Sequence, residues 1–193
     1  MRVGITLTSS VEVGEEYIEL TKMVAKNLAI NNFGIVYGGT DYGMMKELAE
    51  SYKSAGGKDL VGVMAEDLMN VTKGYKAYPT LDEKHIVPTM EDRKKTIIQL
   101  SDGFIVLPGG YGTFEEIGAI VGSKVNKLHS KPVAILNYKG FYNELIEFFK
   151  VLSKKCFSKI EFSDVVYINS DVQAIIKYLL EYTPSDIPDK FVR

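Results

Sequence analysis

Cysteine pairs and long apolar runs are missing from this sequence, and each absence excludes a class of protein. The 193 residues include one cysteine, Cys156, so no intramolecular disulfide and no paired-thiol metal or redox site is expected. No charged leader or apolar signal core precedes the first apolar segment, and no apolar run is long enough to span a bilayer. We therefore expect a cytoplasmic protein with no membrane partner.

An excess of charge of one sign is missing too. The chain has 23 Lys and Arg residues against 25 Asp and Glu residues, a formal net charge of -2, and both signs are spread along its length. Because a nucleic-acid partner requires a basic surface, none is predicted. The charge balance is compatible with a small phosphorylated ligand, since a few backbone N–H groups and one or two cations suffice to hold it.

Metal and cofactor chemistry also lacks its usual residues. The two histidines, His85 and His129, are isolated, and no cluster of metal ligands stands out. A pyridoxal-dependent reaction would need a Schiff-base lysine within a cofactor site, and no lysine stands in such a setting. We expect neither a metal ion nor a cofactor.

Short apolar segments alternate with helical periods along the whole chain. Strands are predicted at residues 1–8, 33–37, 59–64, 85–87, 103–107, 133–136 and 165–168, and helices at 15–31, 44–54, 89–101, 113–128, 142–154 and 172–182. Residues 65–83 show no clear period, and this unusual length hints at a lid or binding loop. Parallel strands need helical crossovers, so the pattern predicts one α/β domain over residues 1–193, a doubly wound Rossmann-like parallel sheet with helices on both faces.

Three polar or glycine-rich turns follow predicted strands, at the edge where doubly wound sheets bind ligands. They are residues 8–10 (Thr-Ser-Ser), 38–43 (Gly-Gly-Thr-Asp-Tyr-Gly) and 107–113 (Leu-Pro-Gly-Gly-Tyr-Gly-Thr). The third turn precedes a predicted helix, so its free N–H groups favour an anion and predict a phosphate cradle. Each turn alone fits a helix cap as well as a ligand site, and only their convergence on one crevice favours a site.

Arg93 is one of two charged residues that the sequence singles out, and it lies near the start of the helix predicted at 89–101. It shares a helical stripe with Ile97 and Leu100, which directs it toward the sheet, where an arginine needs an anion. The alternative is that Arg93 snorkels to the surface. Its neighbours Lys94 and Lys95 are expected to be solvated.

Glu116 is the other charged residue that the sequence singles out. It is predicted in the first turn of the helix that begins near Thr113, where the positive end of the helix favours a carboxylate. The spacing of Thr113 and Glu116 also fits a capping box, in which the glutamate bonds only to the backbone. From spacing alone, the cap is the favoured interpretation.

Residues 90–94 (Met-Glu-Asp-Arg-Lys) and 108–116 (Pro-Gly-Gly-Tyr-Gly-Thr-Phe-Glu-Glu) together resemble the signature of the LOG (LONELY GUY) family, Met-x-x-Arg-Lys with Pro-Gly-Gly-x-Gly-Thr-x-x-Glu. The likeness runs across nearly the whole chain. It implies a homodimeric cytokinin riboside 5′-monophosphate phosphoribohydrolase, which activates cytokinins by releasing an adenine-type base and ribose 5-phosphate. Many members of this family have been labelled lysine decarboxylases.

The resemblance also implies roles for individual residues. Arg93 and Glu116 correspond to the catalytic pair, which changes the interpretation of Glu116 from cap to catalyst. The phosphate-binding turn corresponds to Gly109, Gly110, Gly112 and Thr113, and further candidates for substrate contacts are Ser9, Gly39, Thr40, Met90 and Lys94. The implied substrate is a purine nucleoside 5′-monophosphate, either AMP or an N6-substituted AMP.

The sequence departs from the family pattern close to the expected ligand. Thr8 stands where the family has the first glycine of Gly-Ser-Ser, Glu91 stands where histidine is usual, and residues 63–65 are Val-Met-Ala instead of Val-Ile-Pro. The preferred base is therefore left open. The alternative function is a non-catalytic carrier or sensor for a nucleotide or a phosphorylated pterin, since the same crevice would bind phosphate without cutting a bond. The presence of both Arg93 and Glu116 favours an enzyme.

Overall fold

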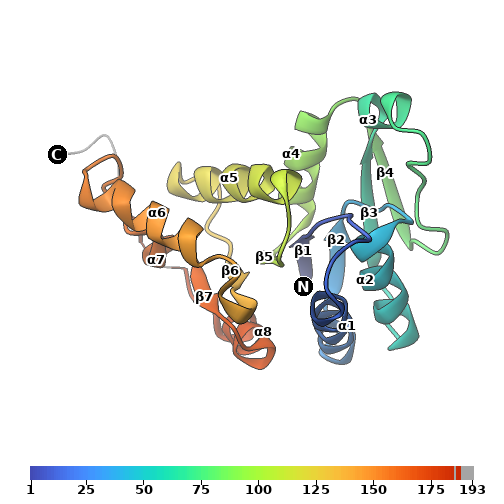
Figure 1. The fold of residues 1–193 in the computed structure, drawn as a ribbon, viewed down its shortest axis with the longest axis horizontal. Coiled ribbons are helices and arrows are strands. Elements are labelled where there is room, and N and C mark those ends of the chain that lie inside the picture. The colour runs from blue at the N-terminus through green and yellow to red at the C-terminus, as the bar shows by residue number, and fades with distance from the viewer. Residues whose placement is uncertain (185, 188–193) are drawn as a thin grey trace.

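The computed structural model describes residues 1–184, 186 and 187, and in this part of the chain seven parallel strands form one sheet with helices on both faces (Figure 1). The strands are β1 (Arg2–Thr6), β2 (Gly34–Tyr37), β3 (Leu60–Ala65), β4 (Glu83–Val87), β5 (Gly103–Val106), β6 (Val133–Leu136) and β7 (Tyr167–Asn169). Their order in the sheet is β4-β3-β2-β1-β5-β6-β7, and every neighbouring pair is parallel. This order confirms the doubly wound Rossmann-like sheet.

Helices cover the sheet because its central strands are apolar on both faces. They are α1 (Glu15–Ile30), α2 (Gly43–Ser54), α3 (Glu66–Val71), α4 (Met90–Leu100), α5 (Tyr111–Val125), α6 (Asn143–Lys154), α7 (Phe162–Val165) and α8 (Val172–Glu181), with a 3-10 turn at Tyr138–Gly140. Helices α1, α2 and α8 share one core, and α5 and α7 share a second on the opposite face. Helix α4 packs on β2 and β3 through Ile97. None of the helices in the described residues is long and apolar enough to cross a membrane.

Two short helices were not predicted from the sequence. Helix α3 lies within residues 65–83, where six helical residues with no buried side chain leave no period to detect. Helix α7 is a single turn, and because it ends at Val165, β7 begins at Tyr167 and not at residue 165.

The beginnings of two other helices are defined by their N-caps. Helix α5 begins at Tyr111 with Gly110 as its N-cap and no side-chain cap, so the capping box and the first-turn position of Glu116 were wrong. The physical reason is that the Gly110 carbonyl already accepts the N–H of Phe114 at 2.9 Å, which starts the helix earlier. At α8, Asp171 is the cap, and its carboxylate accepts the N–H of Ala174 at 2.7 Å.

The winding direction of the sheet reverses between β1 and β5. These two strands are in register, with Thr6 beside Val106, so they end side by side. The chain therefore leaves both strands at the same edge, through residues 7–9 and 107–110. In doubly wound sheets, ligands bind in the crevice at such a reversal point.

Lys124, in the last turn of α5, is a buried cation on the side of the molecule away from this edge. Only 2% of the residue is exposed, and its ammonium donates to the Tyr182 hydroxyl at 3.2 Å and lies 5.1 Å from the centre of that ring. Among the described residues, no carboxylate forms an ion pair with it. Burial lowers the pKa of Lys124 to about 8.

Lys124→Met is expected to stabilise the protein at pH 7 by on the order of 2 kcal/mol, because burial disfavours the charged form. The folded-state pKa lies below the ordinary value of 10.5, so the cost of the charge is fully present below about pH 8 and disappears as the pH rises toward 10.5. Urea unfolding of both proteins at pH 7 and at about pH 10 measures the difference. An equal difference in free energy of unfolding at both pH values, or a less stable variant at pH 7, would contradict this assignment.

Candidate functional site

A cleft of about 590 Å³ opens where β1 and β5 end. Its volume lies within the range typical of small-molecule sites. All three predicted turns contribute to it, together with the segment that follows β3 and the first turn of α4. The lining residues are Leu7, Thr8, Ser9, Thr40, Tyr42, Met45, Leu68, Thr72, Lys73, Gly74, Tyr75, Met90, Arg93, Gly110, Tyr111, Gly112, Thr113 and Glu116.

Arg93 and Glu116 meet in this cleft, as an ion pair between α4 and α5. Arg93 Nη1 donates to Glu116 Oε1 at 2.9 Å, and the two side chains are only 5% and 13% exposed. Arg93 Nε donates at 2.9 Å to the carbonyl of Val63 in β3, which fixes the plane of the guanidinium. The stripe prediction that Arg93 faces the sheet is confirmed. A pair so far removed from water interacts much more strongly than one on the surface.

Gly38, directly after β2, makes room for this arrangement. A Cβ atom at this position would collide with Arg93 Nη2 and would lie 2.8 Å from the sulfur of Met45. The missing side chain is therefore what lets the guanidinium reach Glu116. The sequence identified Gly38 only as a turn residue, because its contact with Arg93 joins distant parts of the chain.

The N-terminus of α5 presents unpaired donors to the cleft. Gly110 provides no side-chain cap, so the first N–H groups of the helix have no partner within it. The hydroxyl of Thr113 is buried and has no hydrogen-bond partner among the described residues. Because Thr113 also lines the cleft, its hydroxyl is available to bond a ligand there. Free N–H groups, the helix dipole and this hydroxyl together suit a phosphate group.

Thr113→Val is expected to weaken the binding of a phosphate-bearing ligand without destabilising the fold. Valine keeps the shape of threonine, and the hydroxyl has no partner to lose in the free protein. A hydrogen bond to a charged group contributes about 1.5–3 kcal/mol, so the Kd for AMP should rise about 10- to 100-fold. Isothermal titration with AMP measures the Kd, with every protein carrying Glu116→Gln so that the ligand is not hydrolysed, and thermal melting measures the stability.

Thr6→Val is the matched control for this experiment. Thr6 is also a buried threonine whose hydroxyl lacks a partner, but it does not line the cleft. The control should bind AMP as the wild type does. Equal Kd values for the Thr113 variant and the wild type would remove Thr113 from the phosphate site.

The remaining predicted contact residues fall into two groups. Ser9, Thr40 and Met90 line the cleft. Gly39, Gly109 and Lys94 do not. Gly39 has φ +72°, and a Cβ there would lie 2.8 Å from the Cα of Gly62, so the backbone geometry alone requires glycine. A Cβ at Gly109 would collide with the side chain of Thr113, so Gly109 makes room for a residue that does line the cleft.

Lys94 points into the contact between α4 and α5. Its ammonium lies 2.6 Å from Glu115 and 3.1 Å from Glu91, and the side chain is only 15% exposed. The prediction that Lys94 is solvated was wrong, because α5 supplies an acidic partner that the periodicity of α4 does not reveal. Lys95, at 62% exposure, is solvated as predicted.

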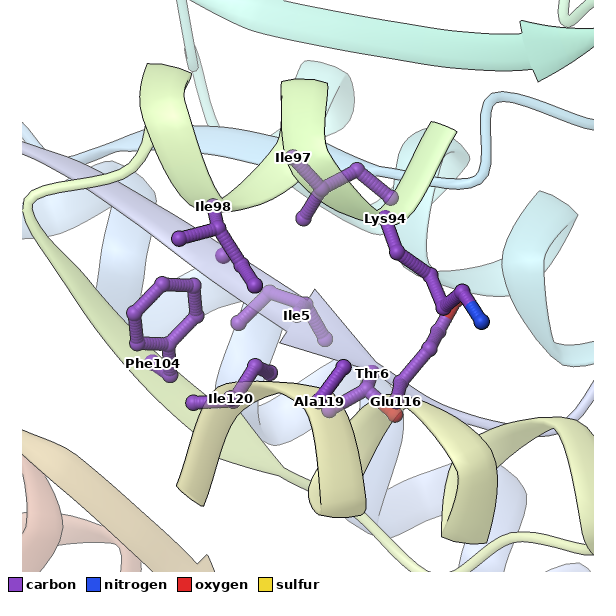
Figure 2. Close-up of a pocket in the computed structure, with 10 residues that line it drawn as sticks. Ile5, Thr6, Lys94, Ile97, Ile98, Phe104, Glu116, Ala119 and Ile120 are labelled. Atoms are coloured by element: carbon purple, nitrogen blue, oxygen red, sulfur yellow. The ribbon is translucent and has the colours of Figure 1, made fainter. Parts of the chain in front are cut away.

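A second hollow lies between the same two helices, on the other side of Glu116 (Figure 2). Figure 2 shows Ile98 of α4 and Ile120 of α5 projecting into this space, with Lys94 and Glu116 at one end. Its volume of about 10 Å³ holds no more than one water molecule. The larger cleft is therefore the candidate site for a nucleotide-sized ligand.

Comparison with known proteins extends the likeness seen in the motifs. A family described as possible lysine decarboxylase matches residues 45–179. The chain is 30% identical over 183 residues to the cytokinin riboside 5′-monophosphate phosphoribohydrolase LOG4 of Arabidopsis thaliana. The aligned region covers 95% of this chain and 83% of that protein. It is 30% identical over 184 residues to LOG1 of the same plant, with 94% and 81% covered.

A solved structure shows the same fold. The molybdenum cofactor carrier protein of Chlamydomonas reinhardtii superposes with a TM-score of 0.70 at 21% identity, covering 94% of this chain and 98% of that one. At this level of identity, the match establishes a shared architecture.

Proposed function

The chain belongs to the LOG family, and on this premise we propose that it hydrolyses the N-glycosidic bond of a purine nucleoside 5′-monophosphate, AMP or an N6-substituted AMP, to a free base and ribose 5-phosphate. The observation that carries the proposal is the buried Arg93–Glu116 pair in a cleft that also contains the uncapped start of α5. An anion-binding turn and a desolvated carboxylate are the two groups that this reaction needs.

The spacing along α5 relates the phosphate to the reacting carbon. Glu116 lies three residues beyond Thr113, so the two side chains share one face of the helix about one turn apart. A nucleotide whose phosphate lies on the first N–H groups of α5 would present its ribose to the Glu116 carboxylate. Binding energy at the phosphate then holds the sugar in place for the reaction.

The proposed reaction passes through a ribose that carries positive charge, by analogy with glycoside hydrolysis. The C1′–N9 bond breaks and its electron pair leaves with the base, while the oxygen of a water molecule bonds to C1′. The Glu116 carboxylate stabilises the cationic sugar and takes one proton from the water, and the base gains one proton. Arg93 orients Glu116 and offsets its charge in the free site.

Lysine decarboxylation is not the function that we propose. A Schiff-base lysine is activated by desolvation or by a neighbouring cation. Lys73, the lysine that lines the cleft, is exposed, and Lys94 is held by two glutamates. The uncapped start of α5 suits phosphate binding and the Glu116 carboxylate suits a cationic sugar, whereas no lysine among the described residues of this cleft is activated for a Schiff base.

We also propose a cytoplasmic homodimer, as the resemblance implies. Two aromatic side chains at the start of α5 support an interface there, since Tyr111 is 96% exposed and Phe114 is 51% exposed. Exposed aromatic residues are typical of the centre of protein interfaces. Size-exclusion chromatography with light scattering tests the dimer, and a monomer at micromolar concentration would contradict it.

Incubation with a panel of nucleotides, followed by chromatography, tests the activity. The panel contains AMP, N6-isopentenyl-AMP, GMP and CMP, with adenosine as the compound that lacks phosphate. We expect free base from the purine monophosphates and far less from adenosine, because adenosine cannot use the α5 turn. Tight binding of these nucleotides without base release would instead favour the carrier function for a nucleotide or a phosphorylated pterin.

A further inference from the structure

Tyr75 is a polar residue in the cleft that the proposed reaction has not yet used. Its hydroxyl is buried and has no hydrogen-bond partner among the described residues, although the residue lines the cleft. Burial raises the pKa of Tyr75, while the charge of Arg93 lowers it and the charge of Glu116 raises it. Tyr75 lines the same cleft as Arg93 and Glu116, and its phenol keeps its proton at neutral pH, so it can donate a hydrogen bond there.

The position of Tyr75 is fixed by the backbone on its C-terminal side. Ala77 forms an antiparallel bridge with Thr40, and the N–H of Tyr78 donates to the carbonyl of Gly39 at 2.8 Å. The side chain of Tyr78 is only 8% exposed and packs into the core shared by α1, α2 and α8. These anchors hold the chain beside the turn after β2, so Tyr75 is preorganised in the cleft wall.

The anchors beside the turn after β2 place Tyr75 across the cleft from the phosphate turn. The phosphate turn follows β5, and β1 lies between β2 and β5. Neighbouring strands are about 4.8 Å apart, so the turns after β2 and β5 start about 10 Å from each other. With phosphate on α5 and ribose at Glu116, the base would extend toward the wall that carries Tyr75.

We propose that Tyr75 donates a hydrogen bond to a ring nitrogen of the departing base, an inference that rests on the proposed function. When the C1′–N9 bond breaks, its electron pair moves onto the base and raises the electron density on the ring nitrogens. A neutral phenol held in the same cleft stabilises that charge, and it does so more in the transition state than in the bound nucleotide. Tyr75 keeps its proton, and the base takes its own proton from solvent.

Tyr75→Phe removes only the hydroxyl and tests this role. We expect kcat for AMP to fall about 10- to 100-fold with KM changed less than about threefold, because the hydrogen bond strengthens as the bond breaks. Thermal stability should stay as in the wild type, since the hydroxyl has no partner in the free protein. Tyr17→Phe, on α1 and outside the cleft lining, is the matched control and should retain full kcat.

Nicotinamide mononucleotide provides a second readout, because its base leaves as a neutral molecule and needs no donor. The phenylalanine variant should cleave it within about threefold of the wild type. The role of Tyr75 would be overturned by an unchanged kcat for AMP, by a rise in KM alone, or by an equal loss of kcat on both nucleotides. If neither the wild type nor the variant cleaves nicotinamide mononucleotide, kcat for AMP alone decides the outcome. Failure of the wild type to release any base would instead reject the proposed function.

Discussion

Replacing Glu116 with glutamine is expected to lower kcat for base release from AMP by at least about 100-fold while the protein stays folded. Glutamine has the same shape, and its amide oxygen can still accept the hydrogen bond that Arg93 donates at 2.9 Å. It lacks the negative charge that stabilises the cationic ribose, and it cannot take a proton from water. Steady-state kinetics and circular dichroism measure the two parts of this prediction.

Glu115→Gln is the control for that substitution. Glu115 is the neighbouring residue on α5, its side chain is 51% exposed, and it pairs with Lys94 outside the cleft. The same chemical change there should leave kcat close to the wild-type value. If the Glu116 variant kept more than about a tenth of the wild-type kcat, Glu116 would not be the catalytic carboxylate.

Replacing Arg93 with lysine is expected to lower kcat/KM for AMP by about 100-fold. The guanidinium donates in two directions at once, to Glu116 and to the Val63 carbonyl, and a lysine ammonium cannot reproduce this planar geometry. Glu116 would keep a nearby positive charge but lose its fixed orientation. The loss should therefore appear in catalysis more than in stability.

Arg93→Met and Lys95→Met extend this test. Methionine at position 93 leaves Glu116 buried without a partner, so the free energy of unfolding should fall by about 3–5 kcal/mol. Lys95 lies two residues further along α4 but is 62% exposed, so its replacement should change neither the free energy of unfolding nor kcat/KM. Wild-type kcat/KM in the Arg93→Lys protein would show that the orientation of the carboxylate is unimportant.

The sequence predicted the sheet well because its strands and longer helices carry clear periods. It missed α3 and α7, since helices of six and four residues are too short for a period to be visible. It predicted correctly that Arg93 faces the sheet, because Ile97 shares its stripe and the stripe is a property of one helix. It placed Lys94 in solvent wrongly, since its partner Glu115 belongs to another helix.

In the candidate site, too, the sequence revealed local motifs but not contacts between distant segments. The motif of the α5 turn was visible in the sequence, but the spacing of Thr113 and Glu116 by itself favoured a capping box over a catalytic site. The start of α5 at Tyr111 excludes the cap. The roles of Gly38 and Tyr75 depend on contacts with parts of the chain that are distant in sequence. Only the length of the connection over residues 65–83 indicated that this segment could belong to a site.

Proton NMR of AMP during incubation with the purified protein tests the central claim most directly. We predict that the C1′ proton signal of AMP is replaced by the anomeric signals of ribose 5-phosphate, with one equivalent of free adenine, and that the Glu116→Gln protein leaves the spectrum unchanged. N6-isopentenyl-AMP and GMP are followed in the same way, to detect hydrolysis if the protein prefers a base other than adenine. Signals that only broaden on binding, with no ribose 5-phosphate from any of these purine nucleotides, would contradict hydrolysis in this cleft.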